Sequence, residues 1–156
     1  YAFPTIIGAK AAAQHRPAVS YAGDGAWAMS MVETMTCVRH DIPVTAVVFH
    51  NRHWGAEKKN QVDFYDRRFI AAELTDQHFV NIAESMGAEG IRVDKLEDVG
   101  PALKKAIDMQ MNERKTTIIE IMCSRELGDL FRKDALSKPV RQLEKYKDFG
   151  EKSPHR

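Results

Sequence analysis

The feature that most constrains the fold is a strand–helix–strand pattern within the first fifty residues. A short apolar run at 18–22 ends at the sequence GDG (23–25), and glycines at such a position mark the end of a strand. An S-x-x-E capping box and helical spacing of apolar residues follow until about residue 40, and a continuous β-branched and aromatic run fills 44–49. This order predicts a βαβ unit with two parallel strands, the second buried on both faces.

The same alternation resumes later in the chain. We expect a short helix over 79–86 that ends at Gly87, a short strand over 91–93, a helix from Pro101 to about residue 114, and a strand over 116–122. Four strands separated by helices predict an α/β fold, an open, mostly parallel sheet with helices on both faces.

Two segments lack clear periodicity. Residues 52–77 are predicted to form one long loop, and loops of this length in compact domains are usually functional or disordered. Beyond residue 124 the chain is rich in charge, and we expect a peripheral helix and tail there. The predicted organisation is therefore an α/β domain over 1–124, incomplete at its N-terminus, followed by a peripheral piece over 125–156.

Composition excludes several classes of protein. The chain carries 23 Lys and Arg against 22 Asp and Glu, so it lacks the basic excess of a nucleic-acid-binding module. No apolar run approaches the length of a membrane-spanning helix, so no membrane partner is expected. The two cysteines, Cys37 and Cys123, form no CxxC motif and are expected to be reduced and buried in a cytoplasmic protein.

Polar residues follow the first two predicted strands at the points where they end. Asp24 lies in the first glycine-flanked turn, and Asn51 follows the second strand. Because parallel strands end at the same edge of a sheet, we expect both side chains to face one crevice, where α/β sheets bind ligands. A carboxylate and an amide suit Mg²⁺, which also takes phosphate oxygens and water. Flanking glycines let backbone N–H groups approach a phosphate, so the pattern favours a diphosphate bridged by magnesium.

Plainer interpretations stay open beside this one. A GDG turn and an asparagine after a strand are each common structural features, which keeps a non-catalytic α/β module as an alternative. Neither a G-x-G-x-x-G nor a P-loop sequence occurs. His50 and His53 have no third nitrogen or sulfur partner in the sequence that would favour zinc. The basic residues of the predicted loop either attract an anionic substrate or form a solvated surface: Lys58, Lys59, Arg67 and Arg68.

The runs 23–31 and 43–51 resemble the thiamine-diphosphate motif, which begins with GDG and ends with a pair of asparagines. His50 stands where the first asparagine is usual. Within that superfamily, the segments 54–66 and 125–141 are similar to sulfoacetaldehyde acetyltransferases. The resemblance covers nearly the whole chain.

The resemblance implies a role for each matching residue. Asp24 and the Asn51 side chain would bind Mg²⁺, with the backbone carbonyl of His53 as the third protein ligand. The residues expected around thiamine diphosphate are Gly23, Asp24, Gly25, Ala26, Trp27 and Asn51.

The resemblance also implies a reaction and a missing part. The cofactor's thiazolium ylide would attack sulfoacetaldehyde, sulfite would leave, and phosphate would take the acetyl group to give acetyl phosphate. The glutamate that activates the cofactor lies, in this family, in a preceding pyrimidine-binding domain and usually acts from a neighbouring subunit. We therefore expect this chain to be the C-terminal piece of a longer homo-oligomeric enzyme, dimeric or tetrameric, and inactive by itself. Acetolactate synthase is the alternative enzyme.

Overall fold

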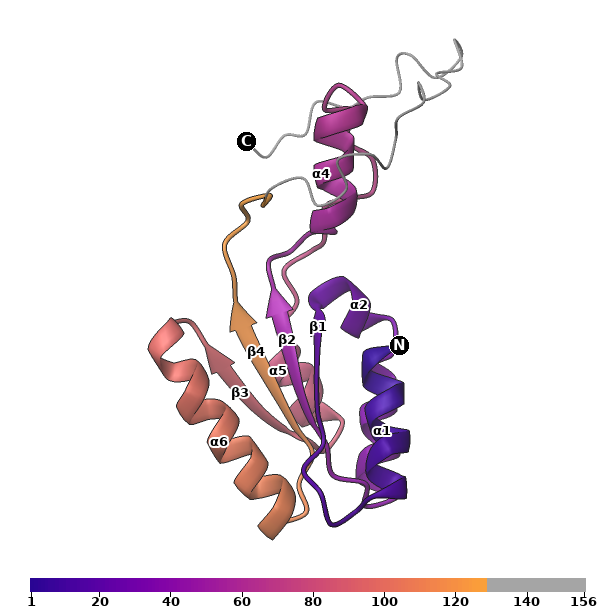
Figure 1. Cartoon of the computed structure of the whole chain (residues 1–156), viewed down its shortest axis with the longest axis vertical. Coiled ribbons are helices and arrows are strands. Elements are labelled where there is room, and N and C mark those ends of the chain that lie inside the picture. Colours follow the sequence, from indigo (N-terminus) through magenta and orange to yellow (C-terminus); the bar gives the residue numbers. More distant parts are fainter. Residues whose placement is uncertain (129–156) are drawn as a thin grey trace. The chain divides into compact units, whose positions relative to one another are not determined.

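The computed structural model describes residues 1–128 (Figure 1). These residues separate into two units, one made of residues 1–51 with 76–124 and the other of 52–75 with 125–128. The first unit contains the sheet. The second contains a helix and the segments that flank it. The predicted tail lies outside the described residues from position 129 on.

The first unit is built on a four-stranded parallel sheet. Its strands are β1 (Val19–Gly23), β2 (Thr45–His50), β3 (Glu89–Val93) and β4 (Thr117–Met122), in the spatial order β1-β2-β4-β3. Every neighbouring pair is parallel, which requires a crossover between consecutive strands. The predicted α/β fold with a parallel sheet is confirmed.

Most helices of this unit cover one face of the sheet. They are α1 (Ala2–Ala12), α2 (Asp24–Ala28), the 3₁₀ turn η1 (Met31–Glu33), α3 (Thr34–Arg39) and α5 (Phe79–Ser85). The indole of Trp27 lies between two phenyl rings, with edge-on contacts to Phe3 and Phe79 at centroid distances of 6.0 and 5.2 Å. This aromatic group, with Val48 and Ile118 of the sheet, forms the larger core.

The opposite face carries the single helix α6 (Leu96–Asn112), which packs on β3 and β4 (Figure 1). Ala102 and Ala106 of α6 meet Ile119 in a second core. Toward β1 and the end of β2 the described residues leave part of this face open: Tyr21 is 74% exposed and Phe49 is 41% exposed. The prediction that the second strand is buried on both faces is therefore wrong at Phe49.

The structure explains why glycine occupies two positions, 87 and 90. Gly87 has φ +87° and ends α5, because glycine enters the left-handed region without steric cost. At Gly90 a Cβ atom would lie 2.4 Å from Val80 Cγ1 and 3.1 Å from Val80 Cα, so a glycine lets α5 approach β3 closely. The predicted end of the 79–86 helix is confirmed.

Helix starts were predicted less well than strands. α6 begins at Leu96, and Pro101 lies inside it. The acidic pair Glu97 and Asp98 occupies the first turn, where negative side chains stabilise a helix, and this favours the earlier start. The proline leaves one carbonyl, that of Glu97, without its intrahelical donor.

The predicted capping box does not form. Ser30 makes no side-chain cap hydrogen bond, and the chain first makes the 3₁₀ turn η1 before α3 begins. The Glu33 carboxylate instead accepts a hydrogen bond from the Thr36 hydroxyl at 2.7 Å. The GDG sequence also starts a short helix, α2, rather than only a turn.

The second unit contains a helix that the sequence analysis missed. α4 (Gly55–Phe64) fills much of the predicted loop, and none of its residues is fully buried. The flanking segments pair with each other: the Trp54 N–H donates to Ala72 O at 2.8 Å, and the Leu74 N–H donates to Arg52 O at 2.9 Å. A polar helix of this kind carries no apolar stripe, so periodicity could not reveal it.

Two general predictions concern the cysteines and the membrane. Both cysteines are free, but only Cys37 is buried, while Cys123 is half-buried. Within residues 1–128, no helix has the length and apolar character needed to cross a bilayer.

Candidate functional site

The carboxyl ends of β1 and β2 bring Asp24 and Asn51 together. Asp24 is only 3% exposed, directly after β1. Its Oδ2 accepts a hydrogen bond from the backbone N–H of Asn51 at 3.1 Å, and its Oδ1 accepts one from the Gly25 N–H at 2.8 Å. The two residues that the motif singled out are therefore neighbours in space, as their strand positions predicted.

These residues fit a magnesium diphosphate group. Each oxygen of a carboxylate can accept more than one interaction, so the hydrogen bonds from the Gly25 and Asn51 N–H groups are compatible with Asp24 also ligating a cation. Gly23 has an extended backbone, φ −69° and ψ 158°, and a Cβ atom there would meet nothing within 4 Å. Neither conformation nor packing requires glycine at this position, whereas close approach of a ligand to the backbone would.

His50 lies beside this pair and is fully buried. Its Nδ1 is 2.6 Å from Glu120 Oε1. Its Nε2 is 3.6 Å from Asp76 Oδ1 and 4.0 Å from Asp24 Oδ2, and its ring contacts that of Phe79 edge-on at 4.9 Å. One imidazole thus faces three carboxylates from three parts of the chain.

Glu120 was not predicted from the sequence as a candidate site residue. The side chain is 1% exposed in the middle of β4, between Ile119 and Ile121. A buried carboxylate is rare unless it is paired. A lone acidic residue in an apolar strand was the signal that could have identified it.

The residues after Asp24 divide between surface and core. Gly25 is buried and Ala26 is exposed. The indole of Trp27 is 1% exposed and belongs to the aromatic core. Because the Trp27 side chain belongs to the core, only its backbone can face a ligand, and the predicted cofactor contacts of Gly25, Ala26 and Trp27 stay predictions.

His53 belongs to the second unit, where it pairs with Glu73 in an isolated antiparallel bridge. Its predicted role as a carbonyl ligand stays a prediction. Within residues 1–128, no group of three or more His, Cys, Asp or Glu side chains is arranged so that it could hold a metal ion. The magnesium site predicted here draws on two side chains and a carbonyl, so this observation bears on zinc rather than on magnesium.

The basic residues of the second unit are partly neutralised. Lys58 and Arg125 both donate to the Glu73 carboxylate, and Lys59 pairs with Asp63 at 2.6 Å. Burial alone would raise the pKa of Glu73, but the hydrogen bond and charge of Lys58, helped by Arg125, hold that pKa below its ordinary value. Two of the four candidate anion-attracting residues are thus already paired.

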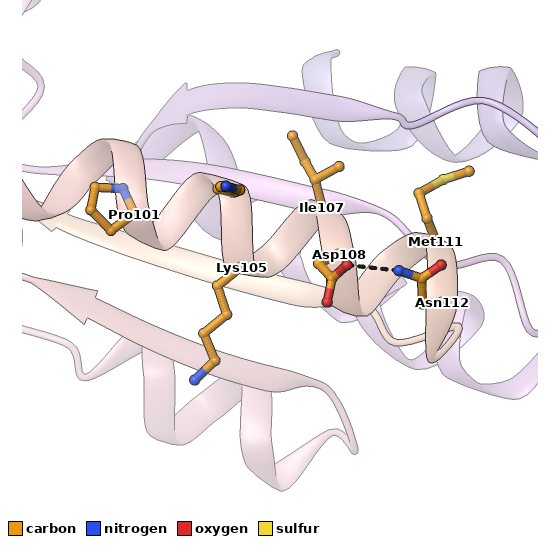
Figure 2. A pocket seen from close by; sticks show the side chains of 7 residues that line it. Pro101, Lys105, Ile107, Asp108, Met111 and Asn112 are labelled. Carbon is orange, nitrogen blue, oxygen red and sulfur yellow. Dashed lines mark hydrogen bonds between the residues drawn. The ribbon is translucent and has the colours of Figure 1, made fainter.

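A separate hollow runs along α6 between Pro101 and Asn112 (Figure 2). Figure 2 shows Asp108 accepting a hydrogen bond from Asn112 one turn later, at 2.7 Å. Every lining residue comes from this one helix, and none belongs to the Asp24–Asn51 site. The hollow and the candidate site are distinct features of the first unit.

Comparison with protein families decides between the classes of protein considered above. Residues 1–121 match the model of the family described as "Thiamine pyrophosphate enzyme, C-terminal TPP binding domain". The chain belongs to this family. The matched residues of this thiamine pyrophosphate domain include β1 and β2, the strands that position Asp24 and Asn51.

Curated relatives of the thiamine pyrophosphate domain carry more specific names. This chain is 80% identical to a sulfoacetaldehyde acetyltransferase from Castellaniella defragrans. The alignment spans 149 residues, which are 96% of this chain and 25% of that relative. The chain is 76% identical to a sulfoacetaldehyde acetyltransferase from Alcaligenes xylosoxydans xylosoxydans, again over 96% of this chain and 25% of that relative. Identity to the acetolactate synthase large subunit of Corynebacterium glutamicum is 32% over 123 residues, 76% of the chain and 19% of that relative. The chain thus spans about a quarter of the length of the first two relatives.

A solved structure supports the fold of the domain. The thiamine diphosphate-dependent 4-hydroxybenzoylformate decarboxylase of Rhodococcus jostii RHA1 superposes with a TM-score of 0.74 over 81% of this chain and 23% of that one. The sequences are 23% identical, so this likeness bears on the fold alone.

Proposed function

We propose that this chain is the diphosphate- and magnesium-binding part of a sulfoacetaldehyde acetyltransferase, an enzyme that converts sulfoacetaldehyde and phosphate to acetyl phosphate and sulfite. The observation that carries the proposal is the contact between Asp24 and Asn51 at the carboxyl ends of two parallel strands. The high identity to named sulfoacetaldehyde acetyltransferases supports the choice of substrate.

In this proposal the residues of the chain bind Mg²⁺ and the diphosphate of the cofactor. Asp24 and the Asn51 amide bind Mg²⁺, and the carbonyl of His53 completes the protein ligands. The open backbone at Gly23 lets the diphosphate approach without a steric barrier. When bound, thiamine diphosphate supplies the nucleophilic carbon that attacks the aldehyde. Holding the diphosphate by two strand ends fixes the position of the rest of the cofactor relative to the sheet.

The remaining parts of the proposal concern the assembly. The activating glutamate belongs to a pyrimidine-binding domain outside these 156 residues, so the chain alone does not turn over. The complete enzyme is a cytoplasmic homo-oligomer, a dimer or tetramer, with residues 125–156 as a peripheral piece of the diphosphate-binding domain. The free cysteines are in keeping with a reducing compartment.

A graft tests this function directly. The matching 149 residues of the Castellaniella defragrans enzyme are replaced by those of this chain, and sulfite release is measured with sulfoacetaldehyde and phosphate. We expect sulfite and acetyl phosphate in equal amounts. A graft that folds but neither binds thiamine diphosphate nor releases sulfite would overturn the proposal. Sequencing upstream of the Tyr1 codon offers a second check, since a pyrimidine-binding domain with its glutamate should be encoded there.

Acetolactate synthase is the second candidate, favoured by the 32% identity to the Corynebacterium glutamicum protein. Pyruvate consumption without sulfite by the full-length protein would favour it. A non-catalytic module would be favoured if Asp24→Ala in the graft left the affinity for thiamine diphosphate with magnesium unchanged, as measured by calorimetry.

A further inference from the structure

A buried hydrogen-bonded pair lies beside the Asp24–Asn51 site. Glu120 in β4 and His50 at the end of β2 are 70 positions apart in sequence, and both are almost completely buried. Their 2.6 Å contact joins Nδ1 of the imidazole to Oε1 of the carboxylate. Burying polar side chains is costly unless hydrogen bonds replace those lost to water.

Glu120 is surrounded by donors from several elements. Besides His50, its Oε2 accepts a hydrogen bond from the Val80 N–H at 3.2 Å, at the start of α5. Arg92 of β3 approaches Oε1 to 3.8 Å. One carboxylate therefore ties together β2, β3, β4 and α5 at the edge where the candidate site lies.

His50 connects Glu120 to the Asp24–Asn51 site. His50 immediately precedes Asn51, whose N–H donates to Asp24. The other ring nitrogen, Nε2, points toward the Asp24 and Asp76 carboxylates at 4.0 and 3.6 Å. With Nδ1 held by Glu120 and one ring edge against Phe79, the ring has little freedom to turn away.

We propose that the Glu120–His50 pair is a positioning device that holds the backbone of Asn51 and the carboxylate of Asp24 in the geometry that receives magnesium diphosphate. The identity of that ligand rests on the proposed function. The geometric part does not, because it concerns contacts within the chain. In this proposal Glu120 and His50 act on the ligand only through Asn51 and Asp24.

Substitutions of His50 can distinguish the role of Nδ1 from that of Nε2. The amide nitrogen of asparagine can occupy the place of His Nδ1, whereas leucine offers no donor. His50→Asn therefore keeps the hydrogen bond to Glu120 and loses Nε2, and His50→Leu loses both. Glu120→Gln keeps the shape of the side chain but removes its charge and one acceptor.

The first measurement is amide hydrogen exchange of the 156-residue chain without ligand. In Glu120→Gln we expect the Asn51 amide to exchange about tenfold faster while the amides of β4 change little. His50→Leu should behave likewise, and His50→Asn should recover most of the protection. The matched control is Gln110→Leu, because Gln110 bonds the backbone of Ala18 at the other end of the sheet and tests general destabilisation.

The second measurement uses the graft with thiamine diphosphate in excess and titrates Mg²⁺, following intrinsic tryptophan fluorescence. Loss of an outer partner of a metal ligand typically weakens binding about 10- to 100-fold, and we expect Glu120→Gln to weaken the magnesium affinity at least tenfold. Parent-like exchange at Asn51 and parent-like affinity in Glu120→Gln would overturn the proposal, as would the same selective change in Gln110→Leu. If the unsubstituted graft binds no cofactor, the proposed function fails, and the exchange measurement alone decides the positioning role.

Discussion

The backbone N–H of Asn51 donates to the Asp24 carboxylate at 3.1 Å across 27 positions of sequence. This hydrogen bond joins the residue after β1 to the residue after β2, so a single carboxylate fixes both strand ends. Parallel strands place their carboxyl ends side by side, and the chain uses that property to assemble a polar site from two short loops.

Asp24→Asn tests this contact as a structural element. The substitution turns one acceptor oxygen into a donor that must face either the Asn51 or the Gly25 N–H. Because a buried donor without an acceptor costs about 1–3 kcal/mol, we expect the free energy of unfolding to fall by that amount in urea denaturation. In the graft, magnesium-dependent cofactor binding should weaken at least about tenfold.

Asp108→Asn is the control for this change. Asp108 is an exposed residue of α6 that accepts a hydrogen bond from its neighbour Asn112. Its substitution should alter stability by less than about 0.5 kcal/mol. Equal effects of the two substitutions would contradict the role given to Asp24.

Gly90→Ala tests the close approach of α5 to β3. The new methyl group would lie 2.4 Å from a Val80 side-chain carbon and 3.1 Å from the Val80 backbone, so the helix must shift. We expect a loss of about 1–3 kcal/mol in the free energy of unfolding, measured in urea. Gly8→Ala is the matched variant, since Gly8 lies inside α1 with nothing within 4 Å of the new methyl, and it should gain up to about 1 kcal/mol.

Much of this fold follows from short-range patterns in the sequence. The four strands were predicted because each is a run of apolar residues bounded by turns, and the Asp24–Asn51 contact followed from their parallel order. The Glu120–His50 contact could not be predicted, because it depends on the register between β2 and β4. α4 was missed because it has no buried apolar stripe; a part-buried contact from Lys58 to Glu73 joins it to the segment that follows.

Cys37 gives a prediction about alkaline pH. Burial, with a smaller contribution from the charge of Glu33, raises the pKa of its thiol from 9.0 to about 11. Between these values the unfolded chain has lost the thiol proton while the folded chain keeps it. Stability is therefore complete below about pH 9 and falls as pH rises toward 11, by at most about 1.4 kcal/mol per pH unit from this group. In Cys37→Ala the free energy of unfolding should depend less on pH between 9 and 11. An unchanged pH dependence would contradict the raised pKa of Cys37.

Glu73 gives the opposite dependence. Its pKa lies below the ordinary value of 4.5 because Lys58 and Arg125 outweigh the effect of burial. Its contribution is present above pH 4.5 and is lost as pH falls through the lowered pKa. We expect Glu73→Gln to increase protease cleavage within residues 52–75 at pH 7 and to reduce the further increase seen on acidification. Glu57→Gln, at an exposed position of α4, should cleave like the parent.

Tyr21 and Phe49 give the last prediction. Their rings lie 6.4 Å apart on the α6 side of the sheet, beyond the part that α6 covers, and both are exposed within the described residues. Because exposed aromatic surface drives association, the isolated 156-residue chain should bind a hydrophobic dye and self-associate. The double variant Tyr21→Thr with Phe49→Thr should reduce both and change the unfolding free energy by less than about 1 kcal/mol, since threonine suits a strand. Ile118→Thr, on the buried face, should destabilise strongly and increase dye binding. Dye binding that is equal in the double variant and the parent would show that this aromatic pair is not the exposed surface responsible.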